Sequence, residues 1–414
     1  MESLTPHSIA EAVARARAHS PFLARQIDVY PDLVGLLHAG QVDAAWDAAR
    51  ALAPEDPVDR RLRVRRSAVA LVAAIADLSG RWDLDAVTRH LSDFADEAID
   101  DALAAAFTER YPDEAPRGVA LIALGKHGSR ELNYSSDIDP ILIFDPETVP
   151  TRAREEPQDA ALRLARRMVS LLSERTGDGY VFRVDLRLRP SPEATPIILP
   201  VDAAISYYES AAVGWEQAAF IRARAAAGDR TLGQGFLSAI RPFVWRRTID
   251  FGAIRAISDV SRRIRAHYAS GQRFGPGFDL KRGRGGIREV EFFAQAHQLI
   301  HGGRNPALRA PATRDALRVL GEAGLIAPEV VAQLDAAYVM LRTTEHRLQM
   351  VDDRQTHSLP EQPGALDNVA RLDGRADGAA LLAALTPHVE ATGLRFDELV
   401  GEDEEGDQRL PDDE

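Results

Sequence analysis

Strand-like sequence is confined to one part of this 414-residue chain, and this limits the possible fold more than any other feature. Val119–Leu124 is a short apolar run that ends at a glycine, which is typical of a buried strand entering a tight turn. Asp137–Phe144 and Tyr180–Arg189 have the character of two further strands. The long regions before and after have helical periodicity. We therefore expect an α+β fold that is mostly helical, with a small α/β domain inserted between two helical regions.

Changes in composition predict where the parts of the chain begin and end. Residues 1–115 are Ala-rich and form a helical N-terminal arm. Residues 116–200 form the α/β domain, and residues 201–398 form a large helical domain. Residues 399–414 are acidic and free of aromatic side chains, so we expect a disordered tail.

Composition excludes several classes of protein. The hydrophobic content of 45% and the charged content of 27% are those of a soluble globular protein. A net charge of −13 argues against sequence-independent binding of nucleic acid. The absence of cysteine removes disulfides and thiolate metal sites, which fits a reducing cytosol. No apolar run of about 18 residues predicts a membrane span, and the N-terminus has no signal peptide. We expect a cytoplasmic protein.

Two aspartates one residue apart form the most informative local pattern. Asp137 and Asp139 lie in a run with strand character, so both carboxylates point to the same face. Asp185 lies on a separate predicted strand whose polar face also carries arginines. Three carboxylates on neighbouring strands offer the oxygen ligands that Mg²⁺ requires in two-metal phosphoryl chemistry. The alternative is a solvent-exposed strand end, where aspartate is common.

A glycine-rich turn, Gly125–Ser129, precedes the aspartates. A turn of this composition lets the backbone approach phosphate closely, and we expect it to open onto a short helix at Arg130–Asn133. Lys126, within the turn, and Lys281, in a second glycine-rich segment, are the only lysines of the chain. A compact ammonium group fits among phosphate oxygens as a point charge. A GC-rich genome that encodes arginine in place of lysine also explains why lysine is rare.

Two later segments combine charged and apolar residues. Trp215, Glu216 and Arg222 form either a core tryptophan with a satisfied ion pair or part of a cleft wall. A helix after the glycine loop near residue 285 carries Glu289 and Glu291 among apolar neighbours. Its charged side chains are either solvated or buried with partners.

Six segments, in order, carry a family resemblance. Their sequences are GKHGSRELNYSSDID, YVFRVDLRLRPS, SYYESAAVGWEQAAFIRARAAAGD, RPFVWRRTIDF, LKRGRGGIREVEFFAQAHQLIHGGRNPALR and EHRLQMVDDRQTHSLP. The Gly-Ser pair followed by D-x-D resembles nucleotidyltransferases of the polymerase-β type. Together the segments resemble glutamine synthetase adenylyltransferase, the adenylyl-transferring and adenylyl-removing enzyme, up to about residue 395. Pro140 and Pro192 depart from the leucine and glycine that are usual in this family.

The resemblance implies a function and a direction of reaction. The family has two related nucleotidyltransferase halves: the N-terminal half removes AMP from a glutamine synthetase tyrosine by phosphorolysis, and the C-terminal half attaches AMP using ATP. The segment GGIREVEF is similar to the removing half. The expected reaction is therefore Mg²⁺-dependent, with phosphate as co-substrate and ADP as product. The alternatives are a forward adenylyltransferase that uses ATP and a non-catalytic regulatory domain.

The resemblance also implies site residues and partners. The expected partners are adenylylated glutamine synthetase and the PII signal protein in its uridylylated form, with no nucleic acid and no membrane. The three aspartates are the expected catalytic metal ligands. The residues expected to contact nucleotide or phosphate are Gly128, Ser129, Lys126, Arg187, Arg189 and Lys281.

Overall fold

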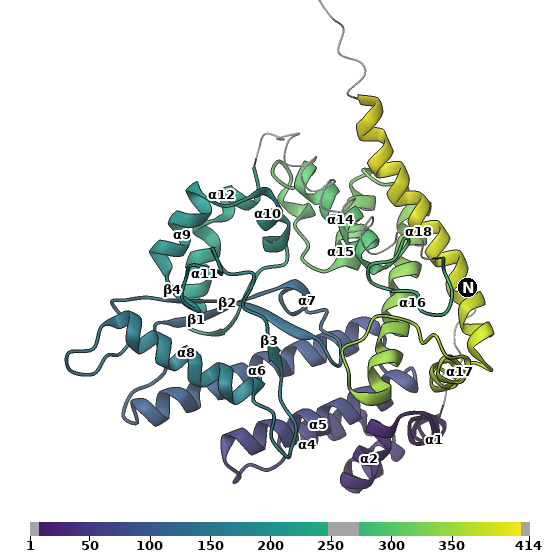
Figure 1. The fold of residues 1–414 in the computed structure, drawn as a ribbon, viewed down its shortest axis with the longest axis horizontal. Coiled ribbons are helices and arrows are strands. Elements are labelled where there is room, and N and C mark those ends of the chain that lie inside the picture. Colours follow the sequence, from purple (N-terminus) through teal and green to yellow (C-terminus); the bar gives the residue numbers. More distant parts are fainter. Residues whose placement is uncertain (1–7, 247–272, 407–414) are drawn as a thin grey trace, which may run out of the picture. The chain divides into compact units, whose positions relative to one another are not determined.

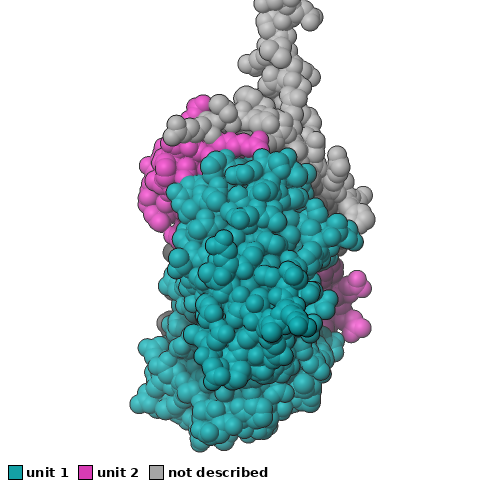
Figure 2. Space-filling view, turned by 90° about the vertical axis from the view of Figure 1, so that its left-hand side faces the viewer, with its two compact units in different colours: residues 1–244, 350–355 teal, residues 245–349, 356–414 magenta. Residues whose placement is uncertain are grey.

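The computed structural model describes residues 8–246 and 273–406, and Figure 1 shows its ribbon. The chain divides into two compact units, which are coloured separately in Figure 2. The first unit comprises residues 1–244 and 350–355, and the second comprises residues 245–349 and 356–414. The expectation of a mostly helical α+β fold with a small sheet is confirmed. The three-part division at 115 and 200 stays a prediction.

Six helices of the described chain precede the sheet in the first unit. Side-chain caps mark several helix starts: Ser8 before α1, Ser20 before α2 and Asp83 before α6. The alanine-rich middle of α5 is fully buried, because its small side chains let neighbouring helices approach closely. The helices are α1 (Ile9–His19), α2 (Pro21–Val29), α3 (Pro31–His38), α4 (Val42–Arg50), α5 (Val58–Leu78) and α6 (Leu84–Arg110).

A five-stranded mixed sheet forms the centre of the first unit. Its strands are β1 (Val119–Leu124), β2 (Asp137–Phe144), β3 (Arg183–Val184), β4 (Ile198–Pro200) and β5 (Arg224–Gly228). The order is β3-β2-β1-β5, and β4 also pairs with β2. β1 is antiparallel to both of its neighbours, whereas β3 and β4 run parallel to β2. Both central strands have the predicted bounds, because each is a buried apolar run.

The third predicted strand, Tyr180–Arg189, is wrong over most of its length. Only Arg183–Val184 pairs as a strand. Before it, the amides of Val181 and Phe182 donate to the carbonyl of Leu172, so the chain is still tied to the end of α8 (Pro157–Ser173). After it, the Asp185 carboxylate accepts the backbone N–H of Arg187 and starts a turn.

Two other predictions are corrected near the sheet. The region after Val201 was expected to be helical, but it contains β5, which pairs with β1 and belongs to the same sheet. The short helix expected at Arg130–Asn133 is instead α7 at Gly125–Gly128. Helix α7 ends because Arg130 takes a left-handed conformation, with φ of +61°.

Pro140 is accommodated within β2. It pairs with Ala123 of β1. On the opposite edge, the pairings found among the described residues involve 137–138 with β3 and 142–144 with β4. Proline therefore lies between the two short parallel strands, at a position where its missing N–H is tolerated.

The last four helices of the first unit pack around aromatic side chains. Tyr208, Phe220, Phe236 and Phe243 are buried, and the ring centroids of Tyr208 and Phe220 are 4.7 Å apart. The helices are α9 (Val201–Ser210), α10 (Gly214–Phe220), α11 (Arg230–Ala239) and α12 (Arg241–Val244).

The regular elements in the described part of the second unit are helices, and an isolated β-bridge joins Asp279 and Ser358. Phe292, Ala296 and Phe396 form one core cluster, and Arg347 and Asp373 form a buried ion pair. Within the described residues, no helix is long and apolar enough to cross a membrane. The expected disordered tail begins as helix, because α18 continues to Gly406, and residues 407–414 lie outside the description. The elements are α14 (Ile287–His301), η1 (Pro306–Leu308), α15 (Thr313–Glu322), α16 (Pro328–Asp352), α17 (Pro363–Leu372) and α18 (Gly378–Gly406).

Candidate active site

The sheet register brings the predicted carboxylates to one face. Asp137 pairs with Arg183 and Ile138 pairs with Val184 in the parallel ladder between β2 and β3. The amide of Asp185 donates to the carbonyl of Ile138 over 2.9 Å, and this bond belongs to the Ile138–Val184 pair, at which the ladder ends. Side chains alternate along each strand, so the next neighbours in this register are Asp139 and Asp185.

Arginine and amide groups hold two of these carboxylates. Arg183 donates from Nε to Oδ1 of Asp137, and Gln355 donates from Nε2 to Oδ2 over 3.1 Å. The guanidinium of Arg187 forms an ion pair with Asp185. Hydrogen bonding from Arg187 lowers the pKa of Asp185 despite partial burial, so this carboxylate is ionised at neutral pH.

The donor set suits a hard divalent cation. Carboxylate oxygens are the ligands that Mg²⁺ prefers, and Mg²⁺ is commonly held by one or two carboxylates together with substrate phosphates and water. Among the described residues, no group of three or more His, Cys, Asp and Glu side chains converges closely enough to hold a metal ion. The structure therefore does not show a formed metal site, and magnesium binding by Asp137, Asp139 and Asp185 stays a prediction.

The glycine turn lies directly against Asp139. Gly125 has φ of +55°, and a Cβ at this position would lie 2.7 Å from Oδ2 of Asp139. Gly128 is equally restricted, because a Cβ there would lie 2.1 Å from the carbonyl oxygen of Arg222. Both positions need glycine: the first for conformation and space, the second for space alone.

The other predicted residues of the turn face inward. Ser129 is buried, and its hydroxyl donates to the carbonyls of Gly125 and Lys126 over 3.3 and 3.4 Å. Lys126 is buried as well. The helix of this turn begins at Gly125, so the backbone N–H groups expected at residue 130 are not at a helix start. Phosphate binding by Gly128 and Ser129 stays a prediction, and the N–H of Ser129 already donates to the carbonyl of Gly125 over 3.2 Å.

A buried hydrogen-bond network, which the sequence did not reveal, holds the Gly125–Ser129 turn against α6 and β5. His127 is fully buried and its Nε2 lies 2.7 Å from Oδ1 of Asp96 on α6. Arg224 of β5 pairs with the same carboxylate and donates to the carbonyls of His127 and Gly128. Burial opposes ionisation of Asp96, but hydrogen bonds from His127 and Arg224 outweigh it and lower the pKa of Asp96. Burial also lowers the pKa of His127, which keeps the imidazole neutral.

The remaining predicted phosphate ligands have different surroundings. The side chain of Arg187 is 85% exposed at the edge of the carboxylate face. The guanidinium of Arg189 donates to carbonyls of its own loop, including those of Leu186 and Pro192, so it organises that loop. Lys281 lies in the second unit, and its contact with phosphate stays a prediction.

The two later segments have structural roles in part. Trp215 is exposed, so it is not a core tryptophan. Glu216 is buried and caps α10 by accepting from the amide of Val213 over 2.8 Å. Burial raises the pKa of Glu216. Glu289 is buried and accepts from the amide of Gly285 over 2.8 Å.

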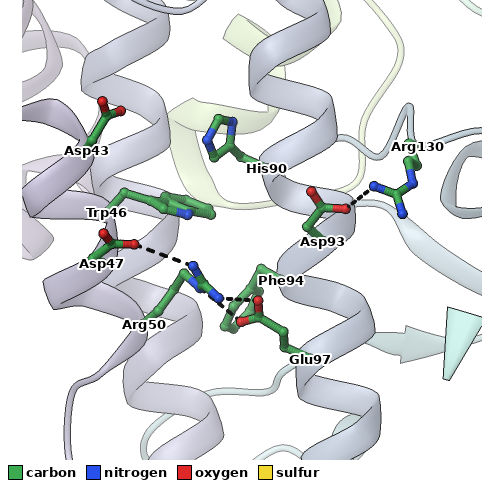
Figure 3. Close-up of a pocket in the computed structure, with 9 residues that line it drawn as sticks. All are labelled: Asp43, Trp46, Asp47, Arg50, His90, Asp93, Phe94, Glu97 and Arg130. Atoms are coloured by element: carbon green, nitrogen blue, oxygen red, sulfur yellow. Dashed lines mark hydrogen bonds and ion pairs between the residues drawn. The ribbon is translucent and has the colours of Figure 1, made fainter. Parts of the chain in front are cut away.

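A pocket of about 600 Å³ lies elsewhere in the first unit, between α4 and α6 (Figure 3). Arg130, immediately after the glycine turn, reaches its edge and forms an ion pair with Asp93 of α6 over 2.6 Å. None of the three aspartates of the β2–β3 face lines this pocket. The lining residues are Asp43, Trp46, Asp47, Arg50, His90, Asp93, Phe94, Glu97 and Arg130.

Two family models match the chain. A model described as glutamate-ammonia ligase adenylyltransferase matches residues 10–239. This match includes all five strands. A model described as PII-uridylyltransferase matches residues 258–400.

Curated relatives match over nearly the whole chain. Bifunctional glutamine synthetase adenylyltransferase/adenylyl-removing enzymes from Caulobacter vibrioides and Xanthobacter autotrophicus are each 44% identical to it. The matches cover 95% and 94% of this chain, but 42% and 41% of the relatives. The corresponding enzyme from Rhizobium meliloti is 42% identical over 93% of this chain and 41% of its own length. The chain thus spans less than half the length of these relatives.

Proposed function

Since the chain belongs to the glutamate-ammonia ligase adenylyltransferase family, we propose that it removes AMP from an adenylylated tyrosine of glutamine synthetase by phosphorolysis. The observation that carries this proposal is the β2–β3 register, which ends at Ile138 and Val184, so that Asp139 and Asp185 are the residues that directly follow it. Asp139 also lies against the Gly125 turn. Carboxylates for a divalent cation and a backbone open to phosphate are the two requirements of nucleotidyl transfer.

The proposed step exchanges one phosphorus–oxygen bond for another. An oxygen of inorganic phosphate attacks the α-phosphorus of the tyrosyl-AMP. The bond from phosphorus to the tyrosine oxygen breaks, so ADP leaves and the phenolate takes a proton. Phosphate is already anionic near neutral pH, so no strong general base is needed. The main obstacle is the approach of one anion to another.

The residues of the site would lower this obstacle in different ways. Asp137, Asp139 and Asp185 would hold Mg²⁺, which when bound supplies positive charge at the α-phosphate and at the leaving oxygen. Gly128 and Ser129 stay predicted contacts to the nucleotide phosphates, and the hydrogen bond from the Ser129 N–H to the Gly125 carbonyl argues against a free donor at Ser129. Arg187 is exposed beside Asp185 and can turn towards the incoming phosphate. Contacts of Lys126, Arg189 and Lys281 with phosphate stay predictions. The hydrogen bonds from Arg189 to carbonyls of its own loop argue against a phosphate contact by that residue.

The direction of reaction is supported by sequence. The chain matches the N-terminal half of relatives whose names include both transferring and removing activities. Its segment GGIREVEF is similar to the removing half. The forward reaction, from ATP to an unmodified tyrosine, is the second candidate, because the names of the relatives include it.

One assay separates the candidates. The chain is incubated with adenylylated glutamine synthetase, Mg²⁺ and phosphate, and ADP is measured. Phosphate-dependent ADP supports removal, and labelling of unmodified synthetase from ATP supports transfer. Binding of the synthetase without either activity would leave a regulatory domain and contradict both enzymatic proposals.

We also propose that the second unit binds the PII signal protein in its uridylylated form. The support is the match of residues 258–400 to a model named for PII-uridylyltransferase. Titration of the full chain with uridylylated and unmodified PII tests this proposal. Tighter binding of the uridylylated form is expected, and equal affinity or no binding would contradict it.

A further inference from the structure

A short segment distant in sequence completes the surroundings of Asp137. Most of α16 belongs to the second unit, but residues 350–355, at and just after the end of this helix, belong to the first unit. This segment brings the Gln355 amide to Asp137, at a sequence separation of 218 residues. It lies within EHRLQMVDDRQTHSLP, a motif to which no role has been given so far.

Three contacts within the first unit anchor the segment. The Ser20 hydroxyl, which also caps α2, donates to the carbonyl of Met350 over 2.6 Å. Arg66 of α5 forms a two-pronged ion pair with Asp353, and both side chains are largely buried. The Ser135 hydroxyl donates to the carbonyl of Asp353 over 3.3 Å. A segment tied at these points holds its next side chains in a defined position.

The backbone turns sharply just before Gln355. Asp353 has φ of +54°, a left-handed conformation that costs a non-glycine residue about 1 kcal/mol. The buried pair with Arg66 holds this conformation. Unfavourable backbone conformations persist where surrounding contacts enforce them, and they are concentrated at functional sites. Here the turn ends α16 and directs Gln355 to the carboxylate face.

The two donors on Asp137 come from different parts of the chain. Arg183 holds Oδ1, and it is itself fixed by the Tyr180 hydroxyl, to which it donates over 2.7 Å. Gln355 holds Oδ2. A carboxylate bonded at both oxygens cannot rotate freely about its terminal torsion. The amide of Gln355 carries no charge, so it orients Asp137 without repelling a cation.

We propose that Gln355 is a positioning residue of the metal site, which orients Asp137 for a divalent cation. This inference rests on the proposed assignment of Asp137 as a metal ligand. Groups that hydrogen-bond to a metal ligand fix its orientation, and their removal typically weakens metal binding about 10-fold to 100-fold.

Direct metal binding tests the proposal. Mn²⁺ is titrated into the full chain in the absence of substrate, and free Mn²⁺ is measured by electron paramagnetic resonance. Gln355→Ala should weaken binding about tenfold. Gln355→Asn keeps the amide but is one methylene shorter, so it should also weaken binding. Arg354→Ala is the matched control, because the exposed side chain of Arg354 is adjacent in sequence to Gln355. The Mn²⁺ affinity of this variant should change less than about twofold.

The outcomes separate the two levels of the proposal. Because Gln355 is exposed, the melting temperature should not change in either Gln355 variant. Equal Mn²⁺ affinity in the wild type and Gln355→Ala would overturn the role of Gln355 and leave the metal site intact. If the wild type bound no Mn²⁺, or if Asp139→Asn bound it equally well, the proposed metal site itself would fail, and the role of Gln355 with it.

Discussion

At the scale of single residues, Gly125 is restricted both by its backbone conformation and by its contact with Asp139. Its φ of +55° and the 2.7 Å gap between a Cβ and Oδ2 of Asp139 both oppose any side chain. We expect Gly125→Ala to lower stability by about 1–2 kcal/mol through the left-handed backbone alone. The added methyl group must also displace Asp139, so phosphorolysis should fall by about 100-fold or more, a misplacement effect known for catalytic groups.

The control for this prediction is another turn glycine. A Cβ added at Gly177 would have no atom within 4 Å. The stability and the phosphorolysis rate of Gly177→Ala should therefore stay close to those of the wild type. Chemical denaturation and initial rates of ADP formation measure the two effects. A Gly125→Ala variant that lost stability but kept full activity would show that contact with Asp139 is not needed for catalysis.

At the scale of elements, one face of α6 holds the turn and the edge strand. Ser92, Asp96 and Asp100 are spaced four residues apart and point the same way. Ser92 accepts from the amide of Leu132, and Asp96 accepts from His127 and Arg224. Asp100 accepts from the amide of Gly228 over 2.7 Å. The helix thus positions the glycine turn through Asp96 and β5 through Asp100.

Comparing two of these aspartates separates positioning from stability. Asp96→Asn removes the charge that Arg224 faces, so the turn carbonyls lose a fixed donor. We expect the KM for the adenylylated protein to rise about tenfold, with a stability loss of about 2–3 kcal/mol. Asp100→Asn, one turn further along, should lower stability less and leave KM unchanged. Equal KM effects in the two variants would mean that α6 acts only as scaffold.

The sequence predicts those elements whose signal is local. β1 and β2 are apolar runs, and the alternation of Asp137 and Asp139 follows directly from strand geometry. The predicted length of β3 is too great, because the alternating pattern of Tyr180–Arg189 does not reveal that the strand ends at Asp185. There the Asp185 carboxylate accepts the backbone N–H of Arg187. β5 was missed because its short sequence, RAAAG, has no strand periodicity and is held by pairing with β1.

The site was predictable only in part for the same reason. Asp137, Asp139 and Asp185 have a local pattern, and the Gly125 turn adjoins them. Asp96 and Gln355 have no local signal, because each reaches the site through tertiary packing. His127 lies within the glycine turn, but nothing in the local sequence indicates that its ring is buried against Asp96.

At the scale of the whole molecule, the chain enters the first unit twice. Its second passage, residues 350–355, is joined to the first by the Arg66–Asp353 pair, whose side chains are 8% and 14% exposed. Removing one partner of a buried pair leaves an uncompensated charge, which costs about 3–5 kcal/mol. Stability in the first unit therefore depends on residues encoded more than a hundred positions after its main part ends.

This dependence can be measured by amide hydrogen exchange. Asp353→Ala should speed exchange in α2, in α5 and in residues 350–355, because Arg66 and the segment lose their shared anchor. Exchange in the second unit, for example in α15, should stay at the wild-type rate. The matched variant is Asp373→Ala, which breaks the buried pair with Arg347 inside the second unit and should speed exchange there instead. If Asp353→Ala left the first unit unchanged, the segment would be a passive connection, and its contact with Asp137 could not be a fixed part of the site.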